Sequence, residues 1–283
     1  MLRLARWGWL TLALLTAWPA AAGPLAERLP DGVRMLSALR YGDDPAETLD
    51  AYLPAQPQHA ALLFMVHGGA WRLGDKGAPA VFLHKVQRWA PQGVIVLSVN
   101  YPLLPHAAPR QQAQSLARAL AFAQRQAPRW GGDPARLVLM GHSAGAHLIA
   151  LLNADASLAH QAGAQAWRGA VALDSAALDV PAIMQRPHPR FYDDAFGAQP
   201  ADWRALSPLH QQTAATPPIL LVCSSRRADA CAQAHAYADA AHALGARAQV
   251  LPQDLSHQEI NAQLGLDNAY TRQVEAFLRD ISR

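Results

Sequence analysis

The chain has 283 residues, of which 51% are hydrophobic, and its 24 Lys and Arg residues nearly balance its 21 Asp and Glu residues. A chain of this length can bury the core of one large domain. It has no basic stripe or Lys-rich tail, so its charge does not favour a nucleic-acid partner.

The first 22 residues have the layout of a secretory signal peptide. Arg3 and Arg6 give a positive start, residues 7–18 are almost entirely apolar, and Ala20 to Ala22 are small residues suited to cleavage. The apolar run is too short to span a bilayer comfortably. We expect an exported protein, periplasmic or secreted, whose domain covers residues 23–283 and keeps no stable membrane span. An uncleaved membrane anchor is the alternative.

From residue 33 onward, short apolar runs alternate with amphipathic stretches. The first two runs have no helix between them and are expected to form an antiparallel edge. The later alternation predicts βαβ crossovers, hence an α/β fold with a mostly parallel sheet of about eight strands and helices on both faces. Strands are expected at 33–41, 47–53, 61–66, 94–99, 136–140, 169–174, 218–223 and 247–251, and helices near 79–90, 109–126, 144–153, 229–244 and 268–281.

Residues 175–216 interrupt this rhythm with several prolines and four large aromatic residues but no clear period. A long insertion within a compact domain is usually a lid or a pocket wall. Its aromatic residues could line a substrate pocket or form the core of the insertion. They are Phe191, Tyr192, Phe196 and Trp203.

The two cysteines, Cys223 and Cys231, lie close together near the end of one predicted strand. In an exported protein such a pair predicts a disulfide bond, which would stabilise the fold by roughly 2–3 kcal/mol. Two buried free thiols are the alternative. The spacing is not the C-x-x-C of a redox-active pair.

Residues 141–145 read Gly-His-Ser-Ala-Gly and directly follow an apolar run. This pattern, between a strand and a helix, holds a serine in a strained turn with its hydroxyl exposed. Ser143 is therefore the candidate nucleophile. A serine becomes nucleophilic when a base takes its proton and an acid fixes the tautomer of that base.

The best candidate for the base is His257, just past the last predicted strand. For the acid we expect Asp229, because it follows the strand at 218–223 and precedes a helix. Asp174, at the end of the preceding strand, is the rival candidate. Asp254 is too close in sequence to His257 to reach its far nitrogen easily.

A second motif, Met-Val-His-Gly-Gly-Ala-Trp at residues 65–71, also follows an apolar strand. Hydrolysis of an ester or amide places negative charge on the carbonyl oxygen, and fixed backbone N–H groups stabilise that charge. Gly68 and Gly69, together with Ala144 after the nucleophile, are expected to form this oxyanion hole. An ordinary Gly-Gly turn is the alternative.

Together, these two motifs and the late histidine resemble the α/β-hydrolase fold, and within it the esterase/lipase group with the HGG oxyanion motif. The resemblance extends to residues 98–101 and 130–134, and to Trp203 and residues 207–209 in the insertion. It implies that Ser143 is acylated, that His257 moves the proton and that Asp229 orients His257. The chain departs from the group's pattern in the acid loop, which begins Cys-Ser-Ser where His-Gly is usual, and in residues 101–105, which lack Ala-Pro-Glu.

We therefore expect a serine carboxylic-ester hydrolase that acts on small or medium esters without a metal or cofactor. The motif at residues 141–148 also resembles the aryl-formamidase branch, which cleaves an N-formyl aryl amide. An acetyl- or feruloyl-esterase acting on plant polysaccharide is compatible with export. A non-enzymatic binding protein on the same fold is the alternative of a different class.

Four other polar residues lie near these motifs. His142 and His147 are expected to be core or loop histidines rather than metal ligands. Arg226 and Arg227 could pair with an anionic group of a substrate, but solvated or salt-bridging arginines are favoured.

Overall fold

The computed structural model describes residues 28–282, and an eight-stranded sheet of order β1-β2-β4-β3-β5-β6-β7-β8 runs through them. Strand β2 is antiparallel to both of its neighbours, and every other pair is parallel. The predicted α/β fold and antiparallel edge are therefore confirmed. The strands are β1 (Arg34–Arg40), β2 (Thr48–Leu53), β3 (Ala60–Val66), β4 (Ile95–Val99), β5 (Gly132–His142), β6 (Gly169–Leu173), β7 (Ile219–Ser224) and β8 (Ala248–Gln253).

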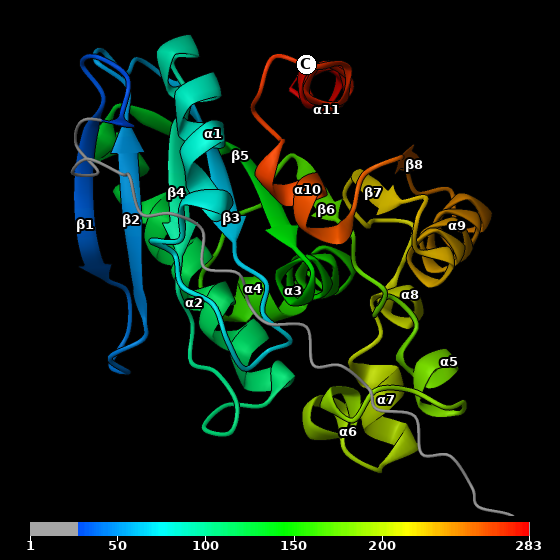
Figure 1. The fold of residues 1–283 in the computed structure, drawn as a ribbon. Helices are drawn as coiled ribbons and strands as arrows, with labels where there is room; N and C mark the ends of the chain where they lie inside the picture. Colours follow the sequence, from blue (N-terminus) through cyan, green and yellow to red (C-terminus); the bar gives the residue numbers. More distant parts are fainter. Residues whose placement is uncertain (1–27, 283) are drawn as a thin grey trace, which may run out of the picture.

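Helices cover both faces of the sheet and divide the core in two (Figure 1). Buried side chains of α2, α3 and α9 pack on one face, and those of α1, α10 and α11 pack on the other. Strands β4, β6 and β7 are buried along their whole length, as expected for parallel strands between two helical layers. The longer helices are α1 (Pro79–Trp89), α2 (Pro109–Gln126), α3 (Ala144–Ala154), α9 (Ala228–Ala243) and α11 (Ala269–Ile281).

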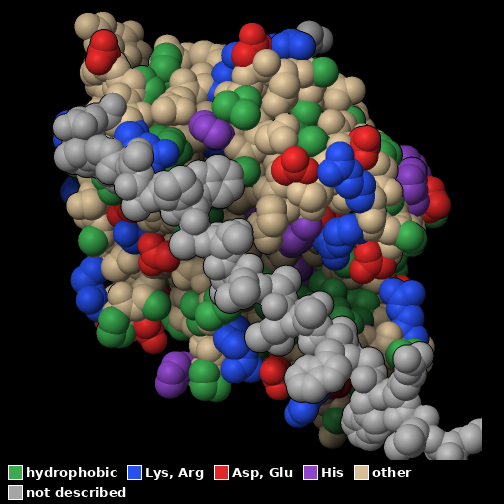
Figure 2. All heavy atoms as spheres, viewed as in Figure 1, with side chains coloured by type: hydrophobic (Ala, Val, Ile, Leu, Met, Phe, Trp, Pro, Cys, Tyr) green, Lys and Arg blue, Asp and Glu red, His purple; other side chains and the backbone are tan. Residues whose placement is uncertain are grey.

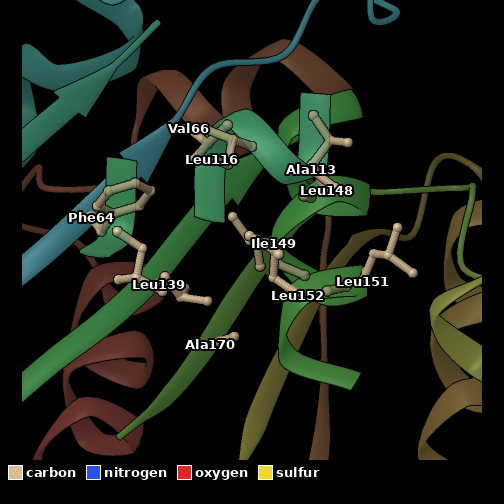
Figure 3. Packing of buried hydrophobic residues seen from close by; sticks show 14 of the residues in the cluster. Phe64, Val66, Ala113, Leu116, Leu139, Leu148, Ile149, Leu151, Leu152 and Ala170 are labelled. Atoms are coloured by element: carbon tan, nitrogen blue, oxygen red, sulfur yellow. The ribbon is translucent and has the colours of Figure 1, made fainter. Parts of the chain in front are cut away.

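Helix α3 is apolar all round because it lies in the middle of the molecule, and every one of its residues is buried. Figure 3 shows its leucines packing among side chains from β3, β5 and α2, including Phe64, Leu139 and Leu116. This packing fixes the amino end of α3, which carries the candidate nucleophile.

Six shorter α-helices and two 3₁₀ turns complete the secondary structure of residues 28–282. Four of the helices form the insertion at residues 175–216, and Figure 1 shows them beyond the ends to which the parallel strands point. These short elements are η2 (Ala90–Gln92), η3 (Ala127–Trp130), α4 (Ser157–Gln161), α5 (Val180–Met184), α6 (Phe191–Phe196), α7 (Pro200–Ala205), α8 (Pro208–Gln211) and α10 (His257–Ala262).

A disulfide bond joins Cys223 to Cys231, which confirms the pairing expected from the sequence. It links the end of β7 to the first turns of α9. Among residues 28–282, no helix is both long and apolar enough to cross a membrane. The expected signal peptide at residues 1–22 lies outside the described residues.

On the face seen in Figure 2, acidic and basic side chains are interspersed. The near balance of charge in the sequence is thus repeated locally on this face. Ion pairs between partly exposed side chains join Arg226 to Asp254 and Arg72 to Asp194.

Candidate active site

Ser143 occupies a strained turn between β5 and α3, with φ 56° and ψ −119°. The flanking glycines are required by close approach of the backbone. A Cβ on Gly141 would lie 2.5 Å from the carbonyl oxygen of Gly145, and one on Gly145 would lie 2.4 Å from that of His67. The backbone N–H of Ser143 donates to the carbonyl of Leu173 over 2.9 Å. A strained conformation of this kind persists only where its surroundings enforce it.

His257 is the first residue of α10, where Ser256 and Glu259 form a capping box. Its Nε2 lies 3.0 Å from the Oγ of Ser143. Its Nδ1 lies 2.6 Å from Oδ2 of Asp174. A nitrogen this close to a carboxylate oxygen carries the proton, so Nδ1–H donates to Asp174 and Nε2 is left to accept from Ser143.

The structure places the two candidate acids differently from the sequence prediction, which favoured Asp229 over Asp174. Asp229 does not contact His257; its side chain is 48% exposed, lies 3.7 Å from Arg227 and accepts the backbone N–H of Ala230 at the start of α9. An aspartate in the first turn of a helix is stabilised there by the helix dipole. The prediction that Asp229 orients His257 is therefore corrected: the carboxylate on His257 comes from one strand earlier.

The carboxylate of Asp174 is fully buried and accepts three hydrogen bonds. The N–H of Ser224 donates to Oδ1 over 2.7 Å, while Oδ2 accepts from His257 and, over 2.7 Å, from Nη1 of Arg227. Burial alone would raise the pKa of Asp174. The hydrogen bonds from His257 and Ser224, together with the charge of Arg227, outweigh burial and hold that pKa below its usual value.

The glycine loop after β3 lies directly against the nucleophile. A Cβ on Gly68 would lie 2.8 Å from the Cβ of Ser143. Gly69 has φ +127°, and a Cβ there would lie 2.0 Å from the carbonyl oxygen of Leu73. Gly68, Gly69 and Ala144 all line the same cavity as Ser143. The structure thus brings the three expected oxyanion-hole residues together around the nucleophile, and their role stays a prediction.

His147 connects the glycine loop to the insertion. Nε1–H of Trp71 donates to its Nδ1 over 3.1 Å, and its own Nε2–H donates to the carbonyl of Leu206 over 2.8 Å. These partners fix the neutral tautomer, and burial lowers the pKa of His147 to about 4. His147 is therefore a structural link between the two walls of the site.

His142 holds the loop that carries the candidate base. Its Nε2–H donates to the carbonyl oxygen of His257 over 2.9 Å. Burial, and then the neighbouring His257 ring, lower the pKa of His142 to about 3, so it is neutral.

Lys85 is a buried residue near the site that sequence analysis did not single out. Its Nζ donates to the carbonyl of Asn261 over 2.8 Å and to Oδ1 of Asn261 over 3.0 Å, which ties α1 to α10. Burial lowers the pKa of Lys85 to about 7. The available sequence signal was its position among Phe82, Val86 and Trp89 on the apolar stripe of α1.

A cavity of about 620 Å³ opens over Ser143 and His257. Phe191 and Tyr192 of α6 line one side of it. Phe196 packs on Trp71 with 4.9 Å between ring centroids, and Nε1–H of Trp203 donates to the carbonyl of Gly197. Of the four aromatic residues noted in the insertion, two therefore line the cavity and two stabilise the insertion.

The fold and the geometry of this site define an α/β-hydrolase of the esterase/lipase type. Residues 49–229 match the profile of the BD-FAE family, and the chain belongs to that family. The resemblance inferred from the two motifs and the late histidine is thereby confirmed.

Relatives found by sequence match only part of the chain. Esterase LipC of Mycobacterium tuberculosis is 33% identical over 156 residues, which are 51% of this chain and 36% of LipC. A probable isoprenylcysteine alpha-carbonyl methylesterase of Oryza sativa subsp. japonica is 33% identical over 118 residues, or 41% of this chain and 28% of the rice protein. The chain therefore spans well under two thirds of the length of these relatives.

Two solved structures share the fold over nearly the whole chain. Esterase B from Lactobacillus rhamnosis superposes with a TM-score of 0.71 at 21% identity, covering 90% of this chain and 87% of that one. A truncated carbohydrate esterase from gut microbiota gives a TM-score of 0.76 at 17% identity, covering 90% and 99%.

Proposed function

We propose that this protein is a serine hydrolase that cleaves carboxylic esters through an acyl-enzyme intermediate. The observation that carries the proposal is the unbroken series of short contacts from Ser143 through His257 to Asp174, of 3.0 Å and 2.6 Å. A serine with a base on its hydroxyl and a buried carboxylate behind the base is the arrangement that nucleophilic acyl transfer needs.

In the acylation step, Ser143 Oγ attacks the ester carbonyl carbon while His257 Nε2 takes the hydroxyl proton. The charge of Asp174 stabilises the imidazolium that forms. The tetrahedral intermediate then expels the alcohol, to which His257 returns the proton. Deacylation repeats these steps with water as the nucleophile, releases the carboxylic acid and restores Ser143.

Negative charge on the carbonyl oxygen is stabilised by backbone N–H groups of the glycine loop and of Ala144. The loop is suited to this because its backbone passes within contact distance of Ser143 with no side chain between them. Fixed donors in such a site contribute about 10²- to 10³-fold to kcat.

The substrate is a small or medium ester. The cavity of about 620 Å³ is within the range of small-molecule sites. The relatives named above are esterases, which favours an ester over an N-formyl amide. The insertion at residues 175–216 supplies the aromatic wall and so selects among esters. The disulfide is compatible with export.

The test is hydrolysis of p-nitrophenyl acetate by the wild type and by Ser143→Ala. We expect kcat/KM to fall about 10⁴- to 10⁶-fold in the variant, because the nucleophile is lost. Ser37→Ala, on the exposed edge strand β1, is the matched control and should retain wild-type activity. Unchanged turnover in Ser143→Ala would refute the proposal. A series of esters of increasing acyl length, run beside an N-formyl aryl amide, then defines the substrate.

A further inference from the structure

Arg227, on the loop between β7 and α9, reaches the pair formed by His257 and Asp174. Its Nη1 lies 2.7 Å from Oδ2 of Asp174 and 2.8 Å from Nδ1 of His257. Its side chain is 29% exposed, lines the cavity and meets a carboxylate that is fully buried. The loop that was expected to supply the acid supplies a cation instead.

The 2.6 Å contact with the carboxylate of Asp174 places the proton of His257 on Nδ1. Nη1 of Arg227 and Nδ1 of His257 are therefore both donors, so they do not bond to each other. Both donate to Oδ2 of Asp174, while the N–H of Ser224 occupies Oδ1. Three donors from different directions leave the carboxylate one orientation, and charged donors form the stronger bonds.

The segment from the end of β7 to the start of α9 provides two of these three donors, Ser224 N–H and Arg227. The disulfide brackets this segment, because Cys223 precedes both donors and Cys231 follows them. Arg226, the neighbour of Arg227, points away to Asp254 and Glu259 on the surface. Only one of the two adjacent arginines therefore engages the triad.

We propose that Arg227 is a positioning residue of the triad, which orients Asp174 toward His257. This inference rests on the proposed ester hydrolysis. Three groups face His257 from the elements packed around it: Asp174 after β6, Arg227 after β7, and His142 at the end of β5, with 4.5 Å between the two histidine rings. His142 is neutral, so the opposing charges are those of Asp174 and Arg227.

Without the guanidinium, Oδ2 of Asp174 keeps only one of its two donors, so the carboxylate is held less firmly against Nδ1 of His257. Removing the guanidinium should therefore lower kcat while leaving KM little changed.

The experiment measures kcat and KM for p-nitrophenyl acetate in the wild type, Arg227→Gln, Arg227→Lys and Arg226→Gln. In Arg227→Gln we expect kcat to fall about tenfold, with KM little changed. Arg227→Lys keeps a charged donor and should recover part of kcat. Arg226→Gln is the matched control and should give the wild-type kcat and KM.

A kcat in Arg227→Gln equal to that of the wild type, or a loss that Arg227→Lys does not restore in part, would overturn the inference. Where Arg227→Gln does not fold, the proton NMR signal of His257 Nδ1–H decides. We expect it to shift between the wild type and Arg227→Lys, and an unchanged signal would overturn the inference. Activity that survives Ser143→Ala would instead refute the proposed function, so the two failures are distinguishable.

Discussion

The loops that follow β3 and β5 are positioned by close backbone packing, whereas those that follow β6 and β7 are positioned by charged side chains and a disulfide. In the first pair, which we term the nucleophile half (residues 67–71 and 141–145), Gly145 packs against the carbonyl of His67 and Gly68 against Ser143. In the second pair, the acid half (residues 174 and 223–231), Asp174 is held by Arg227 and Ser224.

The difference explains why the nucleophile half has a recognisable sequence motif and the acid half does not. Packing of backbone on backbone demands glycine at fixed positions, since any Cβ would collide. A carboxylate at the end of a flexible side chain can reach the same imidazole nitrogen from either of two adjacent strand ends. The carboxylate that contacts His257 can therefore come from either strand end without a change in that contact.

The largest expected effect separates the two candidate acids. Asp174→Asn should lower kcat about 10³- to 10⁴-fold, because the amide no longer favours the required tautomer of His257 or stabilises its imidazolium. Asp229→Asn should remain within about twofold of the wild type, since that side chain is half exposed and does not touch His257. The measurement is kcat for p-nitrophenyl acetate at the pH optimum.

The reverse ranking would show that the acid half rearranges in solution so that Asp229 replaces Asp174. Equal losses in the two variants would mean that the acid half acts through its fold rather than through one carboxylate. Either outcome would contradict the description of the acid half given above and would not affect that of the nucleophile half.

The same distinction explains which parts of the fold and of the site can be predicted from the sequence. The contact between Ser143 and His257 could be predicted, because the first residue lies in a glycine-defined turn and the second follows the last strand. Strand β5 begins at Gly132 rather than at the expected 136, because Gly132 pairs with Ala60 of β3, a long-range contact with no local sequence signal. Helix α10 was missed because six residues are too few to show a period, although its capping box at Ser256 was readable.

The sequence pattern does not decide whether Asp174 or Asp229 contacts His257. Both residues follow apolar strands, and both are suited to a helix start or a turn. What distinguishes them is the φ of 56° at Asp174, which turns it at the end of β6, and the contact of its Oδ2 with Nδ1 of His257. Neither feature has a signature in one sequence.

An intermediate effect is expected in the nucleophile half. Gly69→Ala should lower kcat about 10²-fold, because the new Cβ would meet the Leu73 carbonyl and the loop must move away from the site of negative charge. Gly163→Ala is the matched control: its φ is +86°, but nothing lies within 4 Å of the new Cβ. It should cost about 1 kcal/mol of stability and leave kcat unchanged. Equal kcat in the two variants would show that close packing does not position this loop.

The smallest effect on turnover is expected from the disulfide, whose loss tests whether the acid half depends on covalent support. The double variant Cys223→Ala/Cys231→Ala should lose about 2–3 kcal/mol of unfolding free energy in urea, because the closed loop is released in the unfolded chain. Its kcat should fall only about two- to fivefold, since Arg227 and Ser224 still bond to Asp174 but on a looser loop. A kcat loss as large as that of Asp174→Asn would instead show that the disulfide, rather than the charged side chains, holds the acid half together.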